Sequence, residues 1–321
     1  MTLGLYGGAF SVRSDGKESG MRVIVTGGTG FVGAKLSESL VAGGHEVILF
    51  TRDASRSRDH IHPRVRVVSW APGAAWESWV DGAGGIVNLA GETIAQRWTA
   101  AAKIRIESSR VEAASRLCAA IEKAAVKPSV LVNAAAVGYY GPHGDEVLDE
   151  TAPPGIDFLA TTCVAWEEAA KKAEPLGLRV VRIRTGVVLG GDGGALAKML
   201  PPFKAFAGGP VGSGAQWMSW IHRDDLVALF AFALGNPAAM GAINGTAPNP
   251  VTMKEFATAL GHVLHRPSFL PVPAAAVRLL LGEMATVVLD GQRVVPKKAE
   301  ALGFPFRFTQ IEAALRDVTG G

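Results

Sequence analysis

The sequence predicts an α/β fold, a doubly wound parallel sheet with a smaller C-terminal lobe. Short β-branched runs alternate with helical patterns along the N-terminal part of the chain, as in parallel sheets flanked by helices. After Gly190, pairs of proline and glycine break the chain into short segments, which indicates a second lobe over the sheet edge. We therefore expect the sheet domain at 21–190, with a later contribution around 222–246, and a substrate lobe at 191–321.

The strongest local signal is a strand, a glycine-rich turn and a helix near the start of the chain. Gly27, Gly30 and Gly33 follow a β-branched run and precede an amphipathic helix. Gly27 permits the tight turn, Gly30 lets the backbone approach a pyrophosphate, and Gly33 lets the helix pack on the strand. The helix N-terminus would bind the phosphates. This spacing predicts a Rossmann-type dinucleotide unit rather than a plain turn, with the cofactor held by Gly27, Thr29, Gly30, Phe31, Val32 and Gly33.

The residues after the second strand bear on the choice of cofactor. An acidic residue there would bind the ribose hydroxyls of NAD, whereas an arginine pairs with the 2′-phosphate of NADP. Thr51 and Arg52 come first, and Arg56 and Arg58 continue a basic stretch, so the sequence favours NADP. Asp53 keeps NAD open, because a shift of one residue would bring its carboxylate to the ribose.

The remaining elements of the sheet domain follow in the expected order. The strand that ends in Gly91 closes on small residues, which leaves room for a ligand at the carboxyl edge of the sheet. In the long helix after it, Ile104, Val111, Leu117 and Ile121 should fall near one buried face. The predicted strands are 45–50, 65–68, 85–91, 130–136 and 178–184, and the predicted helices are 99–125 and 157–172.

Composition and charge exclude several classes of protein. The chain is 48% hydrophobic and 19% charged with a net charge of +3, and it has no basic run, so no nucleic-acid surface is expected. The most apolar run, Leu226 to Leu234, is too short to cross a bilayer. Cys118 and Cys163 fit no metal signature, and we expect reduced thiols in the cytoplasm. Residues 1–20 lack the pattern of a signal peptide, so a disordered extension or an upstream start is expected.

With these residues in view, the chain resembles the extended short-chain dehydrogenase/reductase superfamily, whose TGxxGxxG signature matches residues 26–33. More narrowly, it resembles the atypical "epimerase family protein" branch, which ends in a domain of unknown function. The resemblance covers nearly the whole chain from Met21 to about Val318. The matching segments are Asn88–Glu92, Arg97–Trp98, Ser109–Arg110, Val137–Gly141, Trp166–Glu167, Arg184–Gly190, Trp220–His222 and Gly303–Phe304.

The resemblance implies a Rossmann domain that binds NADP and a C-terminal lobe that binds a small-molecule substrate. By position, Thr51 and Arg52 would meet the 2′-phosphate. Many relatives form dimers through the helices after the fourth and fifth strands, so a homodimer is possible. The other implied cofactor contacts are Leu89, Ala90 and Gly91 in the groove, Arg105 and Arg110 on the helix beside it, and Val187 and Val188 at the nicotinamide end.

The chain departs from the superfamily where proton transfer would occur. The superfamily uses a tyrosine, a lysine four residues later and a serine. Alignment on Glu167 puts Leu159 at the tyrosine position and Cys163 at the lysine position, and the serine region reads Ala134–Ala136. None of these side chains performs the acid–base work of the residue it replaces, and Cys163 has no visible basic partner that would make it a nucleophile.

Tyr140 and Tyr139 are the candidate acid–base residues that remain, with Tyr140 equally compatible with a packing role. Glu92, His222 and Asp224 are further polar candidates, although a histidine at this place suits a structural tie. Two functions follow: an NADP-dependent oxidoreductase or epimerase acting on a small polar, sugar-like substrate, or a non-catalytic NADPH sensor. No residue supports a third possibility, a structural or division-related partner.

Overall fold

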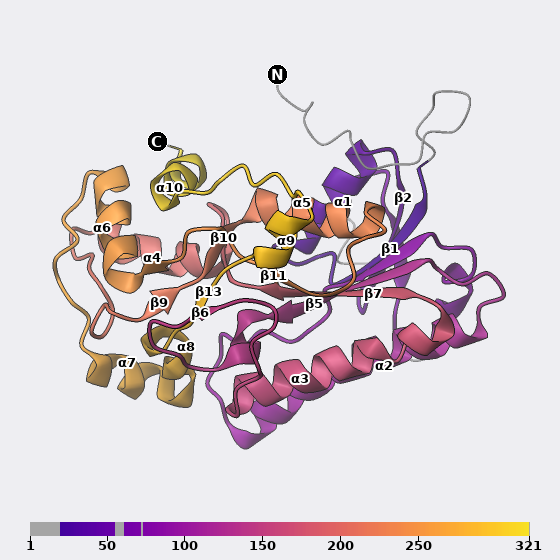
Figure 1. Cartoon of the computed structure of the whole chain (residues 1–321), viewed down its shortest axis with the longest axis horizontal. Coiled ribbons are helices and arrows are strands. Elements are labelled where there is room, and N and C mark those ends of the chain that lie inside the picture. Colours follow the sequence, from indigo (N-terminus) through magenta and orange to yellow (C-terminus); the bar gives the residue numbers. More distant parts are fainter. Residues whose placement is uncertain (1–19, 55–60, 72, 321) are drawn as a thin grey trace.

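Seven parallel strands form one sheet at the centre of the molecule (Figure 1). The structure, a computed structural model, describes residues 20–54, 61–71 and 73–320. Residues 1–19 of the predicted extension lie outside the described residues, and so do Arg56 and Arg58 of the basic stretch. In spatial order the strands are β11 (Gly241–Gly245), β7 (Arg179–Thr185), β5 (Val130–Ala136), β4 (Gly85–Asn88), β1 (Arg22–Thr26), β2 (Glu46–Thr51) and β3 (Arg66–Ser69).

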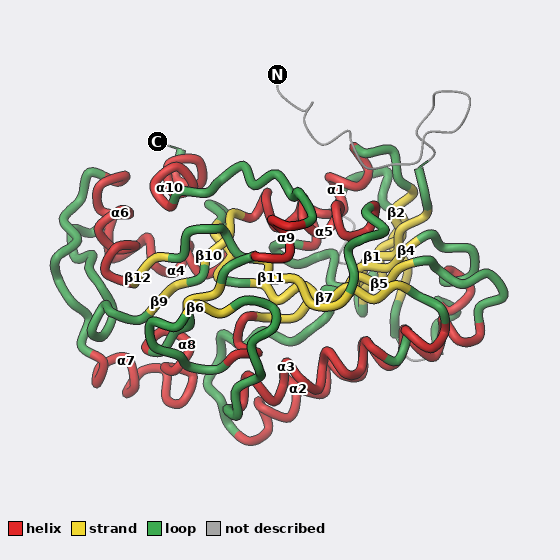
Figure 2. The backbone as a smooth tube through the Cα atoms, in the orientation of Figure 1, coloured by secondary structure: helices red, strands yellow, loops and turns green. Residues whose placement is uncertain are grey.

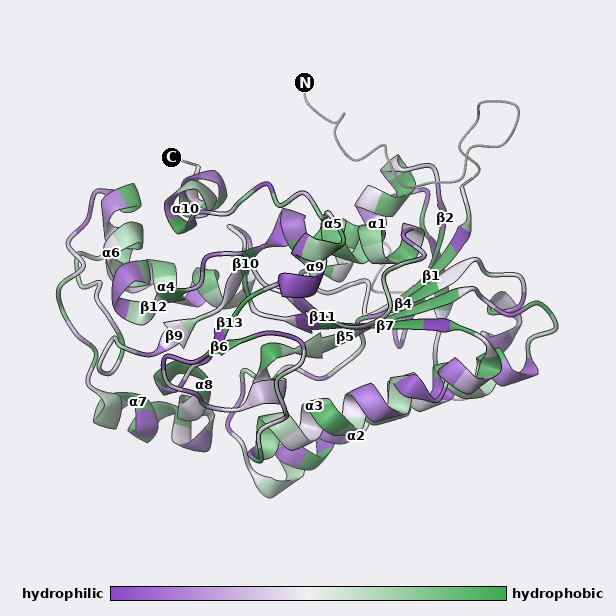
Figure 3. Cartoon of the chain, in the orientation of Figure 1, coloured by the Kyte–Doolittle hydropathy of each residue, from purple (hydrophilic) through white to green (hydrophobic). Residues whose placement is uncertain are grey.

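Helices cover both faces of this sheet, which confirms the predicted doubly wound Rossmann-type fold (Figure 2). One face packs against α1 (Gly33–Ala42) and α5 (Arg223–Gly235), and the other against α2 (Ala100–Lys123) and α3 (Phe158–Lys171). In β1, Val23 and Val25 belong to the first of these cores and Ile24 to the second. The middle of a central strand is therefore apolar on both faces, as Figure 3 shows for the middle of the sheet.

The second lobe has a core of its own, built from α4 (Gly194–Lys204), α6 (Met253–Leu264) and α10 (Ile311–Thr319). Two short strand pairs join the lobe and the sheet domain: β8 (Val187–Leu189) with β10 (Trp220–His222), and β6 (Val147–Leu148) with β13 (Arg293–Val294). A third pair, β9 (Trp217–Met218) with β12 (Val251–Thr252), lies within the lobe. The remaining elements are α7 (Ala274–Leu281), α8 (Thr286–Leu289), α9 (Lys297–Ala301) and the 3₁₀ turns η2 (Glu77–Trp79), η3 (Val137–Tyr140), η4 (Glu174–Leu176) and η5 (Gly282–Ala285).

A buried carboxylate ties the C-terminal segment to the sheet domain. Asp225, in the first turn of α5, is fully buried and accepts hydrogen bonds from the backbone N–H groups of Arg307 (3.0 Å) and Phe308 (2.9 Å). Burial raises the pKa of this carboxyl, while the two backbone donors act in the opposite direction. The chain from α9 to α10 is therefore fixed to α5 by charge-assisted hydrogen bonds.

Two sequence expectations need correction. The fourth strand ends at Asn88, so the small residues up to Gly91 form a loop rather than part of the strand. In α2, Leu117 and Ile121 are fully buried as predicted, but Ile104 is 68% exposed and Ile106 is buried in its place. Within the described ranges, no helix is both long and apolar enough to span a membrane.

Candidate functional site: the glycine-turn groove

Two of the three glycines stand where no side chain fits. Gly27 has φ +66°, and a Cβ on it would lie 2.5 Å from the Leu89 carbonyl oxygen. A Cβ on Gly33 would lie 2.4 Å from the Gly27 oxygen, so the helix could not approach the strand. The turn is closed by a hydrogen bond from the Gly30 N–H to the Gly27 oxygen (3.1 Å). The backbone thus passes through a turn that only glycine permits, with Thr29 and Gly30 exposed above it.

The N-terminus of α1 offers its backbone donors to an anion. Val32 is the N-cap residue, and within the described residues no side chain caps the helix and no acidic residue stands in its first turn. Helices usually begin with a Ser, Thr, Asp or Asn cap that satisfies these N–H groups. An uncapped end at the positive pole of the helix dipole fits the pyrophosphate of a dinucleotide.

Buried amides fix the carboxyl ends of the three central strands beneath this turn. The Thr26 hydroxyl donates to Asn88 Oδ1 (2.6 Å), and Asn88 Nδ2 donates to Asn133 Oδ1 (2.6 Å). All three side chains are fully buried. Asn88 Oδ1 also accepts from the Ala90 N–H (3.3 Å), which shapes the loop of Leu89, Ala90 and Gly91 expected to line the groove. Sequence reasoning assigned no role to these asparagines, although each stands at or near the end of an apolar run.

The residues that should select the cofactor lie at the exposed end of the groove. Thr51 ends β2, Arg52 is exposed, and the Asp53 N–H donates to Thr51 Oγ1 (3.4 Å). Glu92 pairs with Arg105 (Oε1 to Nε, 3.1 Å), and its pKa is lowered by hydrogen bonds from Gln96 and Arg105, with the charge of Arg52 adding to the effect.

The positive charges of Arg105, in contact with Glu92, and of Arg52 both act on this carboxylate, and two such cations suit an added phosphate.

Arg110 is not a solvated side chain. Its guanidinium stacks on Trp166 at 5.1 Å, donates to the Ile106 carbonyl (2.7 Å), and lies 3.0 Å from where a Cβ on Gly91 would stand. Burial lowers the pKa of this guanidinium. Arg105 is more open to solvent, because its side chain is about half exposed.

The second lobe contacts the glycine turn directly. Phe31 packs its ring against the loop that follows β8, where Cβ atoms on Gly190, Gly193 and Gly194 would all come within 3 Å of it. Val187 and Val188, the expected nicotinamide neighbours, lie half-buried in β8 just before this loop. The Arg223 guanidinium lies over the Phe31 ring, 4.7 Å from its centroid. Phe31 therefore links the glycine turn to the start of the second lobe.

The positions that should hold the proton-transfer residues are apolar or inert. A Cβ on Gly138 would lie 3.3 Å from Leu159 and 4.0 Å from Cys163 Sγ, so both side chains face the end of β5. The Cys163 thiol is buried, and burial together with the charge of Glu167 raises its pKa to about 12. The thiol is therefore protonated at neutral pH and is neither a base nor a nucleophile.

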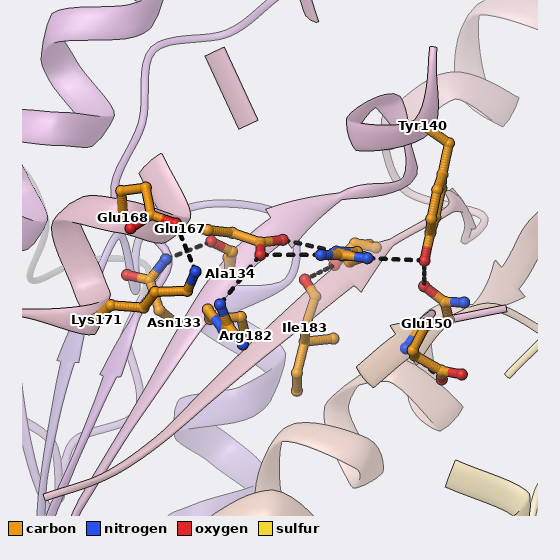
Figure 4. A network of polar contacts seen from close by, with 12 residues as sticks. Asn133, Ala134, Tyr140, Glu150, Glu167, Glu168, Lys171, Arg182 and Ile183 are labelled. Carbon is orange, nitrogen blue, oxygen red and sulfur yellow. Dashed lines mark hydrogen bonds and ion pairs between the residues drawn. The ribbon is translucent and has the colours of Figure 1, made fainter. Parts of the chain in front are cut away.

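Tyr140 is enclosed in a polar network (Figure 4). Its hydroxyl donates to Asn244 Oδ1 (2.7 Å) and accepts from Arg184 NH1 (3.0 Å), and the side chain is fully buried. Burial raises the pKa of the phenol to about 12, although Arg184 acts in the opposite direction. Arg184 in turn forms a bidentate ion pair with Glu167 (2.7 and 3.1 Å). The hydroxyl thus donates one hydrogen bond and accepts another inside the protein. This arrangement agrees with the packing role that the sequence left open for Tyr140.

The other polar candidates have structural partners. Tyr139 is half-buried and lies over the Arg184 guanidinium at 3.4 Å. His222 accepts the Asp224 N–H at Nδ1 (3.1 Å), and its Nε2 lies 3.1 Å from Asp317 Oδ2. Burial lowers the pKa of this imidazole. His222 therefore caps α5 and holds α10, as expected for a structural tie. Within the described residues, no cluster of side chains could hold a metal ion.

Comparison with known proteins agrees with this architecture. Residues 23–244 match the model of the NAD dependent epimerase/dehydratase family, and residues 272–318 match a domain of unknown function, DUF1731. The chain is 49% identical over 309 residues to "Epimerase family protein SDR39U1 homolog, chloroplastic" from Arabidopsis thaliana, covering 95% of this chain and 88% of the relative. It is 40% identical over 297 residues to "Epimerase family protein YfhF" from Bacillus subtilis, with 92% and 97% covered.

A solved structure is similar over almost the same length. The crystal structure of human epimerase family protein SDR39U1 (isoform 2) with NADPH superimposes with a TM-score of 0.84 at 36% identity, covering 94% of this chain and all of that one. The resemblance drawn from the sequence motifs is therefore confirmed. The chain belongs to the NAD-dependent epimerase/dehydratase family.

Proposed function

We propose that this chain binds NADPH in the glycine-turn groove and acts as a binding and sensing protein rather than through the Tyr–Lys chemistry of its superfamily. The uncapped N-terminus of α1 and the turn at Gly27 and Gly33 suit the pyrophosphate. Arg52 and Arg105 suit a 2′-phosphate, and the human relative was solved with NADPH. When bound, the cofactor would supply a hydride donor. A protein that binds NADPH and NADP with different affinity would respond to the ratio of the two.

The observation that carries the non-catalytic part is the identity of the side chains at the end of β5. Leu159 offers no proton, and the Cys163 thiol has a pKa near 12. The Tyr140 phenol has the same pKa and bonds on both sides within the protein. General acid–base catalysis needs a group that titrates near the working pH within reach of the substrate. These side chains do not meet that need, which favours the sensor over the oxidoreductase or epimerase on a sugar-like substrate.

Transmission to the second lobe is supported by the contact between Phe31 and the glycine loop after β8. A dinucleotide seated on the turn would lie against this contact, so binding and release would alter the restraint on residues 190–194. The proposal therefore predicts stronger protease protection of the second lobe when NADPH is bound.

A fluorescence titration with NADPH and NADH tests the cofactor part. We expect NADPH to bind more tightly than NADH, and Arg52→Ala to weaken NADPH by about tenfold or more with little effect on NADH, because a charged hydrogen bond contributes about 1.5–3 kcal/mol. Arg316→Ala, an exposed arginine on α10, is the matched control and should change neither affinity. Equal affinity for both cofactors that does not depend on Arg52 would instead assign the ribose contact to Asp53.

A panel of carbonyl substrates tests the catalytic part. The sensor proposal expects no consumption of NADPH above the rate without protein. Turnover that disappears in Tyr139→Phe, the variant of the half-exposed phenol, would overturn it in favour of the reductase. Sedimentation analysis tests the homodimer, and localisation of a tagged chain tests the cytoplasmic expectation; both remain predictions.

A further inference from the structure

A second, charged cavity lies at the edge of the sheet, on the side covered by α3. It has a volume of about 690 Å³ and lies between α3, the edge strand β11 with its neighbour β7, the segment 149–154 and α9. Of the described residues that line it, none belongs to the predicted cofactor set. Its size falls within the range of cavities that hold small organic ligands.

The carboxylates of this cavity are already engaged. Glu168 pairs with Lys171 (2.5 Å), and Asp149 pairs with Lys297 (2.8 Å). Glu150 accepts from the backbone N–H groups of Asn244 (2.9 Å) and Lys298 (3.2 Å). The remaining carboxylate, Glu167, forms a bidentate ion pair with Arg184 and a longer contact with Arg182 (Figure 4).

Arg182 is left with unused donors. Its NH1 lies 3.5 Å from Glu167 Oε2, an oxygen that already accepts from Arg184 at 3.1 Å. Its Nε is buried and has no hydrogen-bond partner in the part of the chain that the structure describes. The side chain is only 12% exposed, so water compensates this guanidinium poorly. A buried guanidinium that shares one carboxylate with another arginine is a surplus positive charge, and such a charge is costly unless an anion pairs with it.

A second cation converges on the same point. Gly241 has φ +70°, and a Cβ on it would lie 3.4 Å from Lys298 Nζ and 3.5 Å from Arg182 NH2. The ammonium donates one hydrogen bond to the Met240 carbonyl (2.5 Å), which leaves further N–H donors. Because residue 241 has no side chain, the space between the two cations stays open.

We propose that this cavity is an oxyanion-binding site, in which Arg182 and Lys298 hold the phosphate or carboxylate group of a small organic ligand over Gly241. The Arg182 NH2 group, which faces Gly241, supplies N–H donors that suit either group, and the Lys298 ammonium supplies a second charge. The paired carboxylates on the other walls disfavour a ligand with several negative charges. The ligand is therefore a small polar molecule with one anionic group, and its site is separate from the cofactor groove.

Calorimetric titration of the full chain with sodium phosphate and with sodium acetate, at constant ionic strength, tests the site. The titrations are run with and without saturating NADPH. Anion binding in the cofactor groove would disappear when NADPH occupies it, whereas anion binding in the cavity would remain. We expect saturable binding that persists with NADPH and weakens about tenfold or more in Arg182→Gln and in Lys298→Met. Arg22→Gln, an arginine paired with Glu46 on the far side of the sheet, is the matched control and should bind as the wild type does.

Binding of phosphate alone would identify a phosphorylated ligand, and binding of acetate would identify a carboxylate; either supports the site. No saturable binding of either anion, or equal affinity in the wild type and in a folded Lys298→Met variant, would overturn it. Lys298 lies at the surface on α9, so this variant decides the question even where Arg182→Gln fails to fold. The result does not depend on the proposed function, because the variants are compared under the same conditions whether or not NADPH binds.

Discussion

The ion pair between Glu167 and Arg184 should be among the most sensitive points of the fold. Both side chains are at most 4% exposed, and they come from α3 and β7. In Glu167→Gln, one carbonyl oxygen remains to accept from Arg184, while the negative charge is lost. The Arg184 guanidinium then stays buried with no counter-charge, and its hydrogen bond to the Tyr140 hydroxyl does not replace one.

The size of the effect follows from this burial. Removing one partner of a buried ion pair typically costs about 3–5 kcal/mol, because the other charge is left uncompensated. The amide of Gln keeps one of the two hydrogen bonds, so we expect a value near the lower end, about 3 kcal/mol. A loss of this size is a large share of the stability of an ordinary domain, about 5–15 kcal/mol.

Denaturation with urea, followed by circular dichroism, measures the loss. The matched control is Glu168→Gln, the next residue, whose pair with Lys171 is exposed and should contribute about 0.5 kcal/mol or less. If the two variants differ by less than about 1 kcal/mol, Glu167 is not desolvated as the structure requires, and the reasoning is refuted.

Three further changes test other parts of the structure. Gly33→Ala should abolish binding of NADPH and destabilise the fold, because its Cβ would lie 2.4 Å from the Gly27 oxygen. Thermal melting and the NADPH titration measure the two effects. The control is Gly144→Ala, whose Cβ would have no atom within 4 Å and which should be neutral in both assays. Tyr140 has a folded pKa of about 12 against the usual 10, so the folded state holds this proton more tightly, and its contribution to stability, present below pH 10, should be lost as the pH rises towards 12. Unfolding free energies measured across that window should fall more steeply in the wild type than in Tyr140→Phe, and equal slopes would contradict the burial of the phenol. Asp225→Ala should leave two backbone N–H groups without their acceptor and cost about 2–3 kcal/mol, with faster proteolysis before α10; an unchanged cleavage pattern would show that this tie is weak.

The features that the sequence predicted are local ones. The strand, turn and helix follow from the spacing of the glycines, since Gly30 and Gly33 meet atoms of the same turn; only Gly27 also meets a distant residue, Leu89. The strands 130–136 and 179–185 were likewise located to within a residue, because apolar runs of that length have few alternatives.

The role of Tyr140 could not be read from the sequence. Its hydroxyl meets Arg184, 44 residues later, and Asn244, 104 residues later, so only the folded sheet brings the three together. The link between Asn88 and Asn133 spans 45 residues in the same way. The helical phase of α2 was also wrong at Ile104, because several alanines in that helix are small enough to fit either a buried or an exposed face.

The tie between α5 and the C-terminal segment has a consequence for how the protein is made. Asp225 receives its hydrogen bonds from residues 82 and 83 positions later, and His222 meets Asp317 95 positions later. During synthesis, α5 leaves the ribosome before Arg307 and Phe308 are translated. Until then, the Asp225 carboxylate has neither of these two hydrogen-bond donors. A chain truncated before Arg307 would keep that defect permanently. Residues translated about 80 positions after α5 thus complete the first turn of a helix that packs on the sheet, and cellular quality control would recognise chains that stop before Arg307 at this point.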